Sequence, residues 1–125
     1  MKLPLFVYIG PQRVRVVENY PLPNSKFIPK GFESDLGSVP RCFWWFVTPY
    51  EIIYSSIIHD YEWLQADLGL YEYTQSNRNF YKNSIIMDNI PKWKAIIIFN
   101  ALEIVKFYKY LTRRYFPPQQ KNHNT

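Results

Sequence analysis

The sequence predicts an α+β fold in which a small N-terminal antiparallel sheet of two or three strands packs on three or four helices. Residues 3–34 hold short β-prone runs broken by Gly and Pro, whereas from residue 50 onward apolar residues recur at helical spacing. Of the 125 residues, 47% are hydrophobic and 19% aromatic, which is enough for one buried core. We expect a single domain over residues 1–118 and a flexible polar tail over residues 119–125.

The sheet is predicted from three runs in the first thirty residues. Leu3–Ile9 is apolar and β-prone, and a Gly-Pro pair ends it. Gln12–Tyr20 alternates, with Val14 and Val16 on one face, as in a half-buried strand. These two runs predict a hairpin, and the short run Lys26–Ile28 is the candidate third strand.

The helices are predicted from caps and from period. Ser38 suits a helix N-cap and Pro40 suits the first turn, so residues 41–47 should form short helical turns. Longer helical patterns follow over Tyr50–Leu64, Thr74–Met87 and Lys92–Arg114. The last pattern carries an apolar stripe typical of a helix that buries one face. The stripe is formed by Trp93, Ile97, Ala101, Ile104, Tyr108 and Leu111.

Charge and cysteine content limit the classes of protein. The net charge of +5 is compatible with an acidic partner but predicts no fold. A single cysteine, Cys42, excludes an internal disulfide, so a reducing compartment such as the cytoplasm of a host cell is expected, with virion association as a second location. The N-terminus does not read as a signal peptide, and Ala95–Leu102 is too short an apolar run to span a membrane.

The candidate site lies around Asp60, which falls on the apolar stripe of the helix predicted over residues 50–64. A buried carboxylate needs a partner, because an isolated buried charge costs several kcal/mol. His59 borders the same stripe, although neighbours on a helix diverge by about 100°. If the preceding loop folds over this helix, Asp35 and Ser38 converge with the pair on one pocket.

Three hypotheses explain such a pocket. Asp35, His59 and Asp60 could hold one divalent metal ion with a bound water, or His59 could act as a general base oriented by Asp35 without a metal. Alternatively, Asp35 caps the turn at Ser38, and His59 and Asp60 tie the loop to the helix by hydrogen bonds. Ser38 is also a candidate nucleophile, but it lacks a G-x-S-x-G turn, and a helix-capping role explains it as well.

Two other surfaces have a functional and a plain interpretation. The aromatic run Phe43–Phe46, next to Cys42, suits a core with a hydrophobic contact surface better than base stacking. The basic residues Arg113, Arg114 and Lys121 could contact phosphates, but cations near the end of a helix also complement its dipole. Nucleic acid is therefore a less favoured partner than protein.

The spacing GF-x-x-D-x-x-S-x-P-R followed by I-x-HDY resembles the domain-of-unknown-function family numbered 1353, which occurs widely in phage and prophage genomes. The matching residues are Gly31, Phe32, Asp35, Ser38, Pro40, Arg41, His59, Asp60 and Tyr61. The family also carries an R-x-x-A-D-x-x-F segment, and here residues 74–80 place Asn77 at its Asp. An amide oxygen can still bind a metal.

Two functions follow from these residues and from the resemblance. One is a small phage-type hydrolase that uses a pocket formed by Asp35, Ser38, His59, Asp60 and Asn77, with Arg41 and Tyr61 nearby, with or without one divalent ion. The other is a non-catalytic phage protein that binds a phage or host protein, as a virion-assembly factor or an inhibitor of host defence. In that case the polar cluster is structural.

Overall fold

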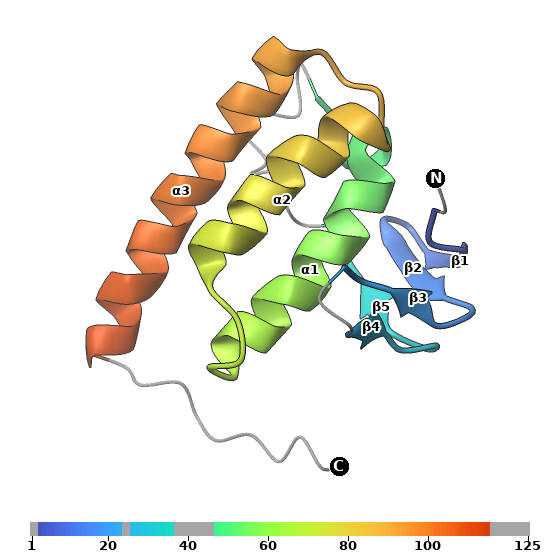
Figure 1. Ribbon diagram of the computed structural model, residues 1–125, viewed down its shortest axis with the longest axis horizontal. Coiled ribbons are helices and arrows are strands. Elements are labelled where there is room, and N and C mark those ends of the chain that lie inside the picture. The colour runs from blue at the N-terminus through green and yellow to red at the C-terminus, as the bar shows by residue number, and fades with distance from the viewer. Residues whose placement is uncertain (1–2, 24–25, 37–46, 116–125) are drawn as a thin grey trace.

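The computed structural model describes residues 3–23, 26–36 and 47–115, without the side chains of Pro49, Tyr110 and residues 112–115. The α+β prediction is confirmed, because small antiparallel sheets pack against three long helices (Figure 1). The helices α1 (Ile53–Asp67), α2 (Tyr73–Ile86) and α3 (Lys92–Tyr115) follow one another outward from the sheet. Helix α1 contacts both β5 (Glu33–Ser34) and α2, and α2 contacts α3.

The main sheet has three antiparallel strands in the order β1 (Phe6–Gly10), β2 (Arg13–Val16) and β5. The predicted alternation in β2 is confirmed, because Val14 and Val16 are buried. Strand β5 lies at one edge of this sheet and pairs Ser34 with Val14. Gly31 turns the chain back toward β2 with a φ of 94°, a left-handed conformation that favours glycine.

The predicted third strand exists, but it belongs to a separate two-stranded sheet. Here β4 (Phe27–Ile28) pairs with β3 (Tyr20–Pro21), and the predicted strand Gln12–Tyr20 is interrupted after Val16. The backbone carbonyl of Val16 accepts a hydrogen bond from the Gly31 N–H, and the Val17 N–H donates to Leu5, so the backbone still bonds alternately to its two neighbouring segments at this point.

The helical region begins with a short 3-10 helix, η2 (Pro49–Ile52), which the sequence predicted as part of the following helix. The backbone N–H of Thr48 donates to the Glu51 carboxylate at 2.9 Å and so fixes this start. The predicted turns over residues 41–47 lie almost entirely outside the described residues. No helix in the described ranges is both long enough and apolar enough to cross a bilayer.

Two clusters form the core, one on each side of α1. The first joins the sheets to α1 through Val14, Val16, Tyr20, Ile28, Leu36, Ile57 and Ile58. The second joins the start of the helical region to α2 and α3 through Val47, Ile52, Phe80, Ile90, Ala95, Ile98 and Leu102. Helix α1 therefore lies in the middle of the molecule.

That position changes which acid of α1 is buried. Asp60 is only half-buried and Leu64 is 39% exposed, so the predicted burial of Asp60 is only partial. The buried acid is Glu62, at 6% exposure. The reason is that α1 packs against the sheets on one side and α2 on the other, which leaves Asp60 at the margin next to β5.

The predicted stripe of α3 is also mostly exposed. Among its members Ala101 is buried, whereas Trp93, Ile104 and Tyr108 are more than half exposed. Helix α3 is apolar on nearly every side, and the face that packs against α2 is the one with Ala95, Ile98 and Leu102. The hydrophobic period of the sequence could not show which of the two apolar faces of α3 packs in the core.

Candidate functional site

A cavity of about 880 Å³ opens between α1, the C-terminal half of α3 and the edge of β5. Three residues singled out by sequence, Asp35, His59 and Asp60, line it. The other lining residues are Arg13, Phe32, Glu33, Ser34, Trp63, Leu64, Asp67, Leu102, Val105 and Lys109. Ser38, Arg41, Cys42 and the aromatic run Phe43–Phe46 lie outside the described residues, so their predicted roles stay predictions.

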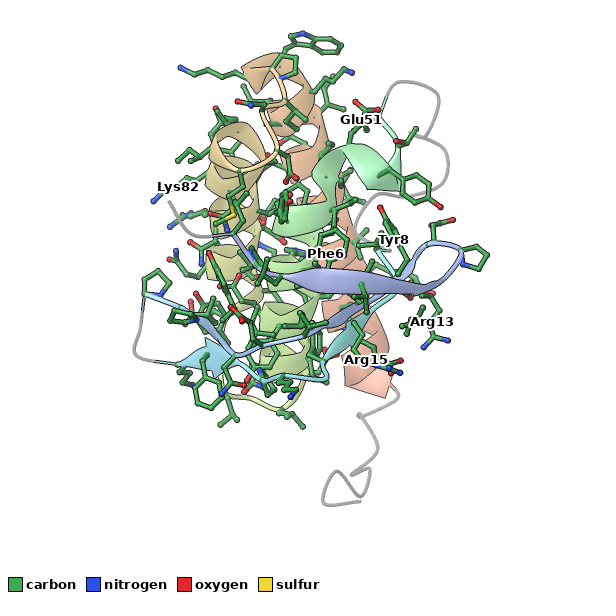
Figure 2. All side chains as sticks on the ribbon, turned by 90° about the vertical axis from the view of Figure 1, so that its right-hand side faces the viewer. Phe6, Tyr8, Arg13, Arg15, Glu51 and Lys82 are labelled. Carbon is green, nitrogen blue, oxygen red and sulfur yellow. The ribbon has the colours of Figure 1, made fainter. Side chains whose placement is uncertain are left out.

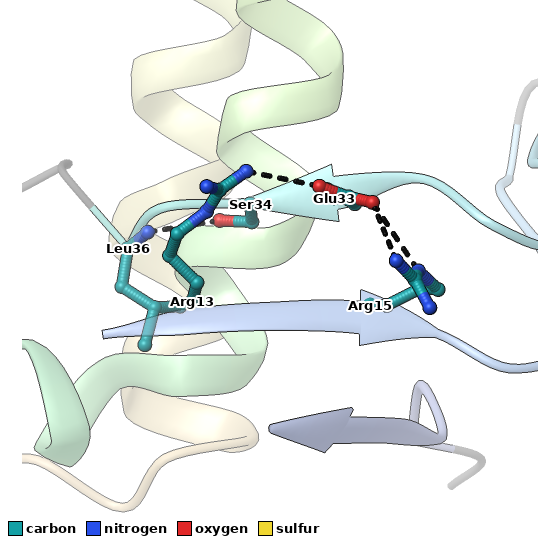
Figure 3. A network of polar contacts seen from close by, with 5 residues as sticks. All are labelled: Arg13, Arg15, Glu33, Ser34 and Leu36. Atoms are coloured by element: carbon teal, nitrogen blue, oxygen red, sulfur yellow. Dashed lines mark hydrogen bonds and ion pairs between the residues drawn. The ribbon is translucent and has the colours of Figure 1, made fainter. Parts of the chain in front are cut away.

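Asp60 is joined to the sheet through Ser34. The Ser34 hydroxyl donates a short hydrogen bond to the Asp60 carboxylate and accepts one from the backbone N–H of Leu36 at 3.1 Å. Figure 3 shows the second of these bonds and the position of Ser34 on β5. Asp35 is exposed and faces the same cavity. A hydrogen bond between the segment around Asp35 and α1 was thus predicted, but the residue that bonds Asp60 is Ser34.

His59 is bonded to a relay of side chains that crosses the three helices, from the buried Asn77 to the half-buried Glu103 and Lys106. Its Nε2 lies 2.8 Å from the Oδ1 of Asn77, and the same oxygen accepts from the Trp63 Nε1 at 3.2 Å. The Asn77 Nδ2 donates to Glu103 at 2.8 Å, and Glu103 accepts from Lys106 at 2.6 Å. Because the Asn77 amide gives its N–H to Glu103, its oxygen faces His59, and Nε2 carries the imidazole hydrogen.

The His59 imidazole is neutral at pH 7. Burial lowers the pKa of His59 to about 4, a hydrogen bond with Asn77 partly opposes this, and Lys109 adds a smaller lowering. An efficient general base has a pKa near the working pH. At about 4 the imidazole is fully unprotonated but weakly basic, which suits a structural bond better than proton transfer.

The cavity lining also includes a cation that lies over two aromatic rings. The Lys109 ammonium lies 2.6 Å from the Asp67 carboxylate, 5.0 Å from the centre of the Trp63 ring and 5.3 Å from that of Tyr73. The Tyr73 hydroxyl also donates a short bond to Asp67. Sequence reasoning missed this group, because nothing in the local pattern joins residues 42 positions apart.

Two arginines on β2 bond the same acid of β5, and one of them, Arg13, lines the cavity. Arg13 and Arg15 both bond Glu33 at 2.9 Å (Figure 3), and both lie on the face turned toward the viewer in Figure 2. The hydrogen bond from Arg15 is the main cause that lowers the pKa of Glu33. These pairs are exposed and contribute little stability.

The metal hypothesis finds no support in the described part of the chain. Within it, no three His, Cys, Asp or Glu side chains gather closely enough to hold an ion. The Asn77 oxygen, the candidate fourth ligand, already takes donors from His59 and Trp63. The metal site predicted from Asp35, His59, Asp60 and Asn77 therefore stays an untested prediction.

Tyr61 and Asn77, which the sequence placed in or beside the pocket, lie at different distances from the cavity. The Tyr61 ring packs edge-on against Phe32, with centroids 5.3 Å apart, beside the loop that ends at Asp35. Asn77 is fully buried behind His59 and does not line the cavity. The match of residues 74–80 to the R-x-x-A-D-x-x-F segment was the signal that found Asn77.

Residues 14–102 match the family model described as "Protein of unknown function (DUF1353)". The chain belongs to the DUF1353 family. No curated protein and no solved structure matches it. The DUF1353 match includes Asp35, His59, Asp60 and Asn77, and it ends one residue before Glu103, the carboxylate that orients Asn77.

Proposed function

We propose that this DUF1353 chain is a non-catalytic accessory protein of phage or prophage type that binds a phage or host protein through the 880 Å³ cavity. The observation that carries the proposal is the bonding of the His-Asp pair. His59 bonds Asn77 and Asp60 accepts from Ser34, so both side chains hold elements of this chain together.

The His59 relay has the properties of a structural link. It runs from α1 through Asn77 on α2 to Glu103 and Lys106 on α3, and Lys106 also donates to Thr74 at 2.9 Å. Removal of one member leaves a buried polar group unsatisfied, which costs about 1–3 kcal/mol. Selection for stability is therefore sufficient to explain why these residue types occur together.

The cavity itself has the make-up of a recognition site for a protein segment. Its wall is apolar and aromatic, with Phe32, Trp63, Leu64, Leu102 and Val105. Charges of both signs surround this wall, among them Arg13, Lys109 and the exposed Asp35. An apolar centre with a polar rim is the usual arrangement of a specific interface. A partner segment would insert an apolar anchor and place polar groups at the rim.

Site-specific photo-cross-linking in cells tests this proposal. A photoreactive residue at Leu64, 39% exposed in the cavity wall, should cross-link one phage or host protein, identified by mass spectrometry. The same residue at Ile86, an exposed apolar position on α2 outside this cavity, is the matched control. Adding Leu64→Arg to a variant labelled at Val105 should abolish the product. Equal cross-linking from Leu64 and Ile86 would contradict binding in the cavity.

A hydrolase is the second candidate, favoured by one observation: His59, Asp60 and Asp35 line a single cavity. Turnover of an ester, phosphate, glycoside or peptide substrate by the wild type, lost in Asp60→Asn with an unchanged circular dichroism spectrum, would establish catalysis and end the non-catalytic proposal. Loss of that turnover after chelation, with metal found by elemental analysis, would identify the metal-assisted form.

A further inference from the structure

Helix α3 carries a second apolar face that nothing in the described structure covers. One side, with Ala95, Ile98 and Leu102, packs in the core. The opposite side, here called the outer face of α3, exposes Trp93, Ile97, Ile104, Phe107, Tyr108 and Leu111, with exposures that reach 70% at Ile104. A helix that is apolar on all sides is normally buried on all sides. Figure 1 shows α3 as the helix farthest from the sheets.

The outer face carries almost no charge. Of the four lysines of α3 that the structure describes, three are engaged with acids: Lys94 with Glu51 at 3.5 Å, Lys106 with Glu103 at 2.6 Å and Lys109 with Asp67 at 2.6 Å. The fourth, Lys92, is the first residue of the helix. A helix that binds a lipid surface has a strongly charged face beside its apolar one. A face without charge is instead suited to another uncharged apolar face, and two copies of it do not repel each other.

From residue 97 to residue 111 the spacing along the outer face is the same in both directions from Ile104. Positions 97, 100, 104, 108 and 111 follow steps of three, four, four and three, as in helices that pack side by side. If two copies of α3 run antiparallel about Ile104, Ile104 meets Ile104, Ile97 meets Leu111, and Asn100 meets Tyr108. A twofold interface requires this reciprocity, in which residue i meets j and j meets i.

The area of the outer face is sufficient for a stable dimer. Six or seven large side chains, each exposed by roughly half and offering about 200 Å² when free, present on the order of 700 Å² per protomer. A standard interface buries about 800 Å² per partner. The α3 residues of the cavity, Leu102, Val105 and Lys109, lie on the other side of the helix, so pairing leaves the cavity accessible.

We propose that the protein is a homodimer in which the outer faces of two α3 helices pack antiparallel around a twofold axis at Ile104. The proposal is independent of the cavity and of what binds there. It adds an interface that lies mostly outside the family match over residues 14–102, since four of the six residues of the outer face follow residue 102.

Sedimentation of the full chain over a wide concentration range tests the dimer. The expected mass is twice 15.1 kDa, and Ile104→Glu should reduce it to one protomer because two carboxylates then meet at the axis. Ile86→Glu, at another isoleucine that is more than half exposed but lies on α2, is the matched control and should stay dimeric. Circular dichroism confirms that both variants fold. A wild type that stays at 15.1 kDa, or association seen only with lipid vesicles, would overturn the proposal.

A disulfide and a charge pair test the register. In a Cys42→Ser background, Ile104→Cys should form a cross-linked dimer on mild oxidation, and Ile86→Cys should not. Tyr108→Glu alone should weaken the dimer, and Asn100→Lys added to it should restore the affinity at least tenfold, because positions 100 and 108 face each other only in the antiparallel arrangement. Restoration absent in the double variant, with Ile104→Cys unreactive, would contradict this register.

Discussion

At the scale of single residues, the two buried titratable groups of α1 affect stability in opposite ways. The folded pKa of His59 is lowered to about 4, so its contribution to stability is complete above about pH 6.5 and is lost as the pH falls toward 4. Burial raises the pKa of Glu62 to about 7, and the hydrogen bond that the carboxylate accepts from Asn79 opposes this rise. Its contribution is complete below about pH 4.5 and is lost as the pH rises through 7.

Glu62→Gln should therefore stabilise the protein under alkaline conditions. The amide keeps an oxygen for the Asn79 side chain, which lies 3.0 Å from the carboxylate, and removes the cost of a buried charge. The shift from 4.5 to about 7 corresponds to about 3 kcal/mol at pH 8 or above and to nothing near pH 4. Urea unfolding at several pH values measures it, with the exposed Glu72→Gln as control. A stability difference that does not vary with pH would contradict the burial of Glu62.

Single residues also show where sequence reasoning succeeds and where it stops. The divergence of neighbours on a helix correctly separated the partners of His59 and Asp60. Asn77 was predicted as a site residue because the R-x-x-A-D-x-x-F segment of the family aligns with residues 74–80. Glu103 and Ser34 were missed, because a hydrogen bond over 26 positions leaves no periodic trace in either segment.

At the scale of elements, α1 begins on a carboxylate from a distant loop. Asp88, between α2 and α3, accepts from the backbone N–H groups of Tyr54 at 3.1 Å and Ser55 at 3.0 Å, and from the Ser55 hydroxyl at 2.6 Å. Desolvation raises the pKa of Asp88, and these bonds oppose the shift. A side chain from outside the helix thus replaces the usual N-cap residue.

Asp88→Ala should lower the free energy of unfolding by about 1–2 kcal/mol, the usual cost of a lost cap. Asp88→Asn keeps one acceptor oxygen and should lose less. Guanidinium unfolding followed by circular dichroism compares the two. Equal stability of the wild type and Asp88→Ala would show that this carboxylate does not hold the start of α1.

Among the elements, length decided what the sequence could predict. The 3.6-residue period recurs over many turns in α2 and α3, so both helices were placed within a few residues. Strand β5 has only two residues, Glu33 and Ser34, which is too few to show alternation. The prediction of which face of α3 is buried was wrong for another reason. A helix with two apolar faces can pack either face in the core, and the sequence pattern does not distinguish them.

At the scale of the whole molecule, the proposed dimer makes stability depend on concentration. Binding to the folded state alone raises the melting temperature by mass action. We expect the Tm of the wild type to rise with protein concentration and that of Ile104→Glu to stay constant. Differential scanning fluorimetry at several concentrations measures both, and a constant Tm in the wild type would count against dimerisation.

The site as a whole was predicted better than its chemistry. Convergence of Asp35, His59 and Asp60 on one cavity followed from a loop placed before a helix, and the structure brings all three there. The chemical role of these side chains depends on how deeply they are buried and on their bonding partners in three other elements, and neither can be read from one sequence. For His59, the structure shows the partners as the relay of Asn77, Glu103 and Lys106.

Nuclear magnetic resonance of the His59 ring tests the central claim, that the imidazole is a fixed structural group, most directly. A His123→Gln variant leaves a single labelled imidazole in the chain. We predict the neutral form with hydrogen on Nε2, unchanged from pH 8 down to about pH 5, and protonated only near pH 4 as the protein loses stability. A ring that titrates near pH 6.5 in the folded protein, or that carries its hydrogen on Nδ1, would contradict the structural assignment and favour catalysis.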